Sequence, residues 1–206
     1  MDKPPESEVR RYARRVGNPR LLRALDRIDE IHAEDPSRDA DGRAKELVYA
    51  ERMTAWLSRL VEGADESLEV AVRAQHLARW RCPRAAFPDG RVGYLAWRKN
   101  AQRAHAEDVG SVCRACGYDD AFVARVAALV LKKARTTDAA AQTLEDCACL
   151  VFLAHELDAF VAKHAEEKVI EILRKSWGKM SEPARAAALG IAYSERGRAL
   201  VTRALA

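Results

Sequence analysis

Three ionisable side chains occupy helix positions where the sequence pattern calls for an apolar residue. His76, His105 and Asp146 each continue an apolar stripe of a predicted helix, and His76 follows Leu68 and Val72 at steps of four residues. A buried carboxylate is costly unless it is paired or bound to a metal. Imidazole nitrogens and carboxylate oxygens are ligands for zinc, manganese, iron or magnesium. These three residues could therefore hold a divalent cation, or form a hydrogen-bonded core network without a metal.

Arginines gather around His76 in the sequence and on the next predicted helix. The candidates for binding an anion are Arg73, Arg79, Arg84 and Arg98. The planar guanidinium suits bidentate binding of a phosphate or carboxylate. The alternative is a solvated face whose arginines pair with acids, namely Glu46, Glu66 and Glu69. Trp80 and Trp97 flank a loop that contains prolines and could stack a planar ligand, or anchor the core instead.

The elements that must position these residues are helices. No alternating run of Val, Ile and Thr exceeds four residues, so strand signals are nearly absent. Apolar periodicity and capping residues predict helices over residues 19–33, 43–61, 65–79, 93–116, 119–133, 140–163 and 166–180, followed by a short helix after Ser181 and a helical C-terminal segment. The fold class is therefore all-α, a compact single-domain helical bundle. We expect a basic flexible tail over residues 1–17, one domain over 18–190 and a C-terminal helical extension over 191–206.

Composition narrows the class of protein without naming a function. The chain has 206 residues, 49% of them hydrophobic, and a formal net charge of +4. That charge is too small to indicate general nucleic-acid binding. No run of about 18 apolar residues exists, so we expect no membrane span. Five cysteines without a secretory signal indicate reduced thiols in the cytoplasm. Their spacing inside predicted helices favours small core residues over a zinc site.

Several segments together resemble a known family over about residues 18–189. They are KELVYAERMTAWL, RAQHLARW, GYLAWR, LEDCACLVFL and EEKVIEILRKSWGKMS. The family is uncharacterised and is called domain of unknown function 4202. It in turn resembles a distant branch of the HD-domain superfamily, helical proteins of which many are metal-dependent phosphohydrolases of nucleotides. The resemblance implies an HD-like fold and a divalent metal.

The order of the HD-domain motif selects the same inward residues. His105 is similar to the intermediate histidine of the motif, and Asp146 is similar to its late aspartate. Two positions depart from the pattern. Tyr49 stands where the first histidine is expected, and the His-Asp pair is replaced by Gln75-His76 or by His76-Leu77, depending on the register. This would leave three protein ligands, which is enough for a catalytic metal.

The leading hypothesis is a metal-dependent phosphohydrolase acting on a small nucleotide-type phosphate ester. His76, His105 and Asp146 would hold the metal, which would lower the pKa of a bound water. Glu145 or Glu46 would act as general base. The residues expected to bind the phosphate or the rest of the substrate are Arg73, Arg79, Arg84, Arg98, Gln75, Trp80 and Tyr49.

Two alternatives remain open. One is a non-catalytic binding or regulatory module for an anionic ligand or a protein partner, which the incomplete motif favours. The other is an RNA-associated protein that uses the basic N-terminal residues together with Arg174 and Lys175. The modest net charge argues against this last interpretation, because phosphate contacts dominate nucleic-acid affinity.

Overall fold

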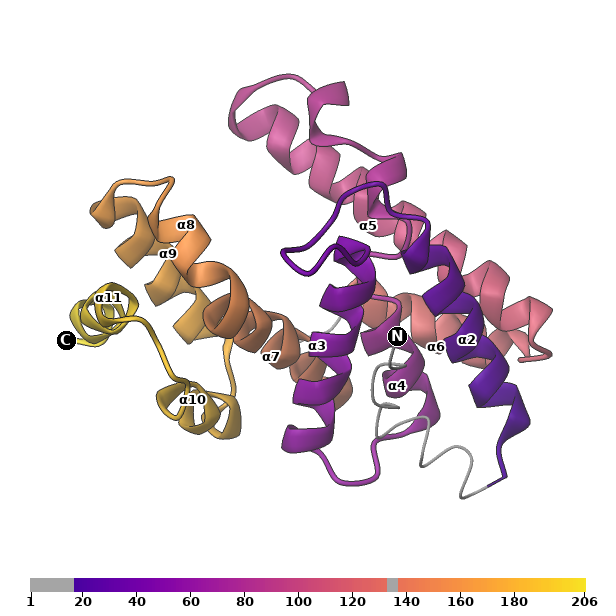
Figure 1. Ribbon diagram of the computed structural model, residues 1–206. Coiled ribbons are helices and arrows are strands. Elements are labelled where there is room, and N and C mark those ends of the chain that lie inside the picture. Colours follow the sequence, from indigo (N-terminus) through magenta and orange to yellow (C-terminus); the bar gives the residue numbers. More distant parts are fainter. Residues whose placement is uncertain (1–16, 133–136) are drawn as a thin grey trace. The chain divides into compact units, whose positions relative to one another are not determined.

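The computed structural model describes residues 17–132 and 137–206, and these residues are helical (Figure 1). They form ten α-helices and no strand, only an isolated antiparallel bridge between Arg38 and Ala44. The prediction of an all-α protein is confirmed. The chain separates into two compact units, unit 1 (residues 1–134) and unit 2 (residues 135–206). This division falls within the predicted domain over residues 18–190. The predicted tail lies outside the described residues except for Gly17.

Unit 1 contains five described α-helices. They are α2 (Pro19–Ala33), α3 (Lys45–Leu60), α4 (Glu66–Arg73), α5 (Gly90–Ala115) and α6 (Asp120–Val130), with 3-10 turns at Arg79–Arg81 and Arg84–Ala86. Helix α4 packs against α2, α3 and α6, and α5 packs against α2 and α6. Side-chain caps begin three of these helices, because Asn18, Asp65 and Asp119 each accept a hydrogen bond from a backbone N–H in the first turn.

The prediction of a helix over residues 65–79 is wrong in its second half. Helix α4 ends at Arg73, and His76 and Ala78 have positive φ angles of 66° and 53°. A non-glycine residue in this region is strained, and tertiary contacts must hold it there. We call residues 74–79 the histidine turn. It leads His76 away from the α4 helix face on which the sequence pattern had placed it.

The chain before α5 folds back closely onto the first turn of that helix. A Cβ atom at Gly93 would lie 1.8 Å from the backbone oxygen of Pro88, so only glycine allows this approach. Arg84 donates hydrogen bonds to the carbonyl oxygens of Phe87 and Pro88, at 2.8 Å each. The start of α5 is therefore braced by its own preceding loop.

Unit 2 is built from five shorter α-helices. They are α7 (Ala139–Val151), α8 (Leu157–Val161), α9 (Glu166–Lys179), α10 (Glu182–Leu189) and α11 (Glu195–Leu205). Helix α9 packs against α7, α8 and α11, and α10 packs against α7. The predicted helix over 140–163 is interrupted by a π-helical turn at Phe152–Glu156, which joins α7 to α8. Leu157 and Val161 are buried directly after this turn.

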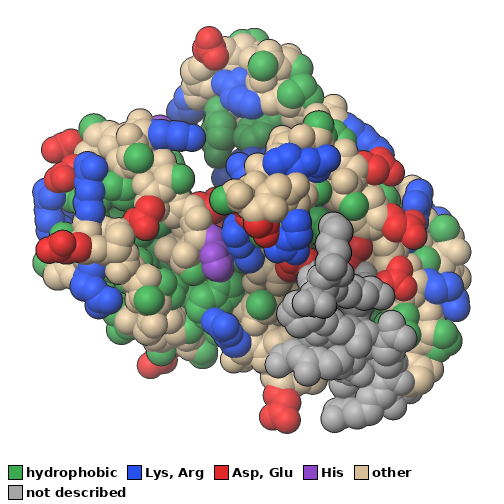
Figure 2. All heavy atoms as spheres, in the orientation of Figure 1, with side chains coloured by type: hydrophobic (Ala, Val, Ile, Leu, Met, Phe, Trp, Pro, Cys, Tyr) green, Lys and Arg blue, Asp and Glu red, His purple; other side chains and the backbone are tan. Residues whose placement is uncertain are grey.

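No helix in the described part of the chain is both long enough and apolar enough to cross a membrane. Cationic and anionic side chains are interspersed over much of the face drawn in Figure 2. Many of them form exposed ion pairs, such as Arg27–Glu30 at 2.8 Å and Arg81–Glu34 at 3.0 Å. Pairs of this kind contribute little to stability.

Candidate functional site

His76 lies at the centre of a group of polar side chains in unit 1. Its ring stacks on Tyr49, with ring centroids 4.5 Å apart and an interplanar angle of 18°. Its Nδ1 is 3.6 Å from Oε2 of Glu46. A guanidinium nitrogen of Arg79 is 3.0 Å from the ring nitrogens. We call Glu46, Tyr49, His76, Arg79 and His105 the His76 site.

These contacts fix the protonation state of His76. A guanidinium can only donate, so the imidazole must accept from Arg79 and must be neutral. An Nδ1–H directed at Glu46 with Nε2 accepting from Arg79 satisfies both neighbours. The pKa of His76 is lowered well below 6.5, mainly by burial and then by the positive charge of Arg79. His76 thus has a cation, Arg79, and an acid, Glu46, as neighbours.

His105 reaches the histidine turn from α5. Its side chain is buried, and its Nδ1 is 2.7 Å from the carbonyl oxygen of Leu77. A carbonyl oxygen can only accept, so Nδ1 carries the proton and Nε2 carries a lone pair. Burial, helped by the charge of Arg79, lowers the pKa of His105 to about 4. No described residue forms a hydrogen bond with Nε2, and the ring centroid is 5.9 Å from that of His76.

His32 belongs to the same neighbourhood and was missed in the sequence. It is fully buried in α2, and its Nε2 donates to the carbonyl oxygen of Arg73 at 3.0 Å. Its Nδ1 lone pair and Oε1 of Gln75 are buried atoms without a hydrogen-bond partner in the described structure. His32 follows Ile28 by four residues on the apolar stripe of α2. The pattern that selected His76 would therefore also have found it.

The predicted phosphate-binding arginines have different environments. Arg73 is buried and forms a bidentate pair with Asp29, at 2.6 and 2.8 Å. Two of its guanidinium nitrogens are therefore engaged by Asp29, and its predicted role in binding phosphate stays a prediction. Arg84 is engaged by backbone carbonyls, and Arg98 is exposed on α5. Trp80 is half-buried beside the guanidinium of Arg81. Of these arginines, only Arg79 forms a hydrogen bond with His76 in the described structure.

Arg79 is a half-buried cation held by rings rather than by acids. Its guanidinium carbon is 5.1 Å from the ring centroid of Trp97, and its other neighbour is the imidazole of His76. No described carboxylate forms an ion pair with it. Trp97 is itself fixed, because its Nε1 donates to the carbonyl oxygen of Cys82 at 2.8 Å. The guanidinium is therefore positioned with unused donors.

The predicted acids Glu145 and Asp146 belong to unit 2. Asp146 is buried and accepts hydrogen bonds from the backbone N and Oγ of Ser181, at 2.9 and 2.6 Å, and from Gln142 at 2.9 Å. Glu145 is buried beside Nζ of Lys179, at 3.2 Å. These contacts tie α7 to the start of α10. They give Asp146 a structural role that the sequence pattern did not specify.

Within each unit, the described residues do not form a group that could bind a metal ion. No group of three or more His, Cys, Asp or Glu side chains in the described residues is arranged to hold a metal ion. In unit 1 a guanidinium lies against the His76 ring nitrogens, where a metal ligand would need a free lone pair. Coordination by His76, His105 and Asp146 together stays a prediction.

Replacing Asp146 with alanine is expected to lower the free energy of unfolding by about 2–3 kcal/mol. The change leaves the Ser181 and Gln142 donors without their buried acceptor and loosens the start of α10. Urea unfolding followed by circular dichroism measures this. The control is Asp120→Ala, whose side chain is 95% exposed and whose loss should cost about 0.5 kcal/mol or less. Equal effects of the two substitutions would contradict the structural role of Asp146.

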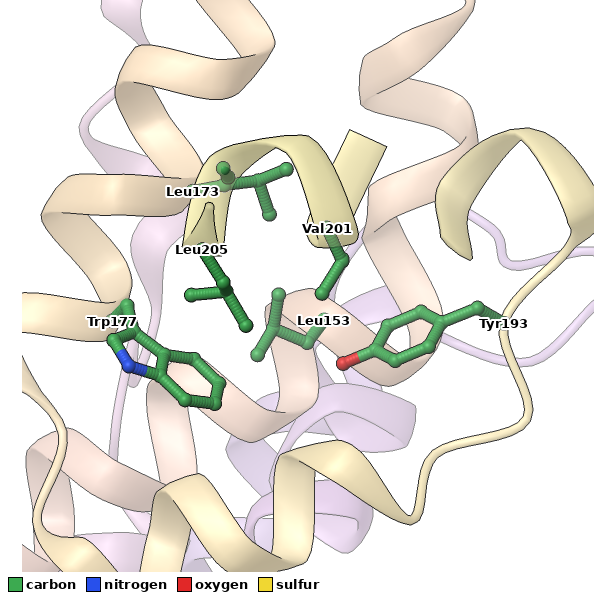
Figure 3. Close-up of a pocket in the computed structure, with 7 residues that line it drawn as sticks. Leu153, Leu173, Trp177, Tyr193, Val201 and Leu205 are labelled. Atoms are coloured by element: carbon green, nitrogen blue, oxygen red, sulfur yellow. The ribbon is translucent and has the colours of Figure 1, made fainter. Parts of the chain in front are cut away.

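A small cavity in unit 2 carries no comparable chemistry. It is lined by Leu153, Leu173, Trp177, Tyr193, Val201, Ala204 and Leu205 (Figure 3). Its volume is about 10 Å³. A space of that size holds about one water molecule, and an apolar lining offers water few partners. The cavity is a packing gap of the α9–α11 core rather than a ligand site.

These observations define an all-helical protein with a half-buried histidine–arginine site. Residues 22–201 match the family model described as a domain of unknown function, DUF4202, and the chain belongs to this family. The family resemblance seen in the sequence is confirmed. No curated protein and no solved structure matches the chain. The further likeness to HD-domain hydrolases stays a prediction.

Proposed function

We propose that this protein binds a small phosphorylated molecule at the His76 site. The observation that carries the proposal is Arg79, a half-buried guanidinium that lies against an imidazole and an indole and has no carboxylate partner among the described residues. A buried charge is costly when it is uncompensated. A phosphate group would compensate it through charge-assisted hydrogen bonds.

The other residues of the site support an anionic ligand. The charges of Arg79 and Lys132 both lower the pKa of His76, so two cations lie near this imidazole. The Nε2 lone pair of His105 can accept a hydrogen bond from a hydroxyl of the ligand. Glu46 lies beside Nδ1 of His76 and favours the tautomer that leaves Nε2 towards Arg79.

Isothermal titration calorimetry with inorganic pyrophosphate tests the proposal. We expect Arg79→Gln to weaken binding at least tenfold, because the guanidinium supplies the main charge-assisted contact. The matched control is Arg81→Gln, which removes an exposed arginine two residues away and should change the affinity less than twofold. No binding by the wild-type protein at millimolar pyrophosphate, or equal losses in the two variants, would reject the site.

Hydrolysis of the bound phosphate ester is a second candidate function. One observation favours it: the Leu77 carbonyl holds His105 in the tautomer with Nε2 unprotonated, as a general base or a metal ligand requires. Asn at position 105 would keep a donor to Leu77 and remove this lone pair. If the protein is a hydrolase, we expect it to release phosphate from nucleoside monophosphates. His105→Asn should then abolish this release while ligand binding persists.

Measuring the metal content of the purified protein tests whether His76, His105 and Asp146 bind a metal ion. The protein is purified without chelator and analysed for manganese, iron, zinc and magnesium, beside His76→Ala and Asp146→Ala. Near-stoichiometric metal that both folded variants lose would support coordination by residues of both units. Metal-free protein that binds pyrophosphate without added divalent ions would instead support the binding module alone.

A further inference from the structure

One segment of unit 1 carries a large excess of positive charge. Residues 79–103 contain seven Arg or Lys and a single acid, Asp89, which gives a net charge of +6. The whole chain carries only +4, so the remainder is net negative. The small net charge of the whole chain therefore does not show how basic residues 79–103 are. The argument against nucleic acid from net charge does not apply to this segment.

The cations of α5 in this segment are exposed and not neutralised. Arg91, Arg98, Lys99 and Arg103 are all exposed, and none of them forms an ion pair with a described residue. Some exposed cations elsewhere in the described chain do have acidic neighbours, as Arg27 has Glu30. Four unpaired cations along one helix repel each other and favour an extended anionic partner over a single phosphate group.

Aromatic and aliphatic side chains lie among these cations. Tyr94 is 45% exposed, and its ring centroid is 5.8 Å from that of Trp97. Val92 and Leu95 are also exposed, at 83% and 50%. Cationic and hydrophobic side chains lie side by side on the upper projection of Figure 2, where Figure 1 places the start of α5. An exposed ring beside unpaired cations offers stacking and phosphate contacts together.

We infer that the first half of α5 is a binding surface for single-stranded nucleic acid. Arg91, Arg98 and Lys99 would contact phosphates, and Tyr94 would stack on a base. A membrane is the less suitable partner, because a membrane-surface helix needs a long apolar face and here only Val92 and Leu95 are exposed aliphatic residues. The inference does not rest on the His76 site, because none of the residues proposed to contact the nucleic acid belongs to that site.

Fluorescence anisotropy of labelled 20-nucleotide oligo(U) and oligo(dT) tests the inference with the full-length protein. We expect binding at 50 mM salt that weakens steeply as salt rises, because phosphate contacts release counterions. The variant Arg91→Gln/Arg98→Gln/Lys99→Gln should bind at least tenfold more weakly, with a log–log salt slope smaller by about two. Tyr94→Ala should weaken binding about tenfold and leave the slope unchanged, because stacking is uncharged.

The matched control removes three exposed cations from unit 2, Lys168, Lys175 and Arg196, each replaced with glutamine. It should bind the oligonucleotides within about twofold of the wild type. Preference for oligo(U) over oligo(dT) would identify RNA as the ligand, and equal affinity would identify single strands of either kind. No binding at 20 mM salt, equal losses in the two triple variants, or binding only to phosphatidylserine vesicles would overturn the inference.

Discussion

Replacing Arg73 with methionine is expected to lower the free energy of unfolding by about 3–5 kcal/mol at pH 7. The guanidinium is buried, with its side chain 5% exposed, and it forms two parallel hydrogen bonds to Asp29 across α2 and α4. Removing the guanidinium takes two charge-assisted hydrogen bonds from a largely buried carboxylate. Arg73 also contacts Oγ1 of Thr54 on α3 at 3.3 Å, so one side chain links three helices.

Urea unfolding of three variants separates this pair from a general effect of losing an arginine. Arg81→Met breaks an exposed pair with Glu34 and should cost about 0.5 kcal/mol or less. Adding Asp29→Asn to Arg73→Met should cost less than the sum of the two single changes, because the partners act as a unit. Additive losses, or a loss below about 1 kcal/mol for Arg73→Met, would show that the pair is not a main contact of unit 1.

Acidification is expected to destabilise the protein steeply between pH 6.5 and pH 4. Burial lowers the pKa of His32 and of His105 to about 4 from the ordinary value of 6.5. In this interval the unfolded chain binds protons that the folded chain does not, so stability rises with pH. Each shift corresponds to roughly 3 kcal/mol at most, a stabilisation present above pH 6.5 and lost as the pH falls through 4.

His105→Asn isolates this contribution. The free energies of unfolding of the wild type and the variant are measured at pH 7 and at pH 4.5. Between pH 7 and pH 4.5 the wild type should lose about 2 kcal/mol more stability than the variant. Glu69 acts in the opposite direction, because burial raises its pKa to about 7 and its stabilising protonation is lost as the pH rises. That effect is common to both proteins and cancels in the comparison. A gap that does not change with pH would contradict the lowered pKa of His105.

The helices could be predicted because their signals are local. Asn18 and Pro19 mark the start of α2, and Gly117, with a φ of 86°, follows the end of α5 as expected. The histidine turn could not be predicted from periodicity, because its strained backbone is held by hydrogen bonds from residues far away in the sequence. His32 and His105 bind the carbonyls of Arg73 and Leu77, separations of 41 and 28 residues.

The candidate site could be predicted only in part, because some of its residues are marked by local patterns and others depend on contacts between distant segments. His76 and His105 were found because ionisable groups on apolar stripes are conspicuous, and the structure places their rings close together. The ion pair of Arg73 could not be predicted, because a sequence shows that an arginine is present but not which carboxylate it meets. Asp29 supplies that carboxylate from another helix, 44 residues away. The concentration of charge in residues 79–103 is readable in the sequence, but its exposure is not.

The π-helical turn at Phe152–Glu156 has a consequence for deletions in this segment. A π turn accommodates one residue more than an α turn, and each residue of an α-helix advances the side-chain direction by about 100°. Removing Ala154 would therefore leave an α turn in its place and allow α7 and α8 to join as one regular helix. Leu157 and Val161, now 2% and 4% exposed, would keep their direction towards the α8–α9 core. The turn therefore behaves as an absorbed one-residue insertion, and a further inserted residue would have no second π turn to absorb it.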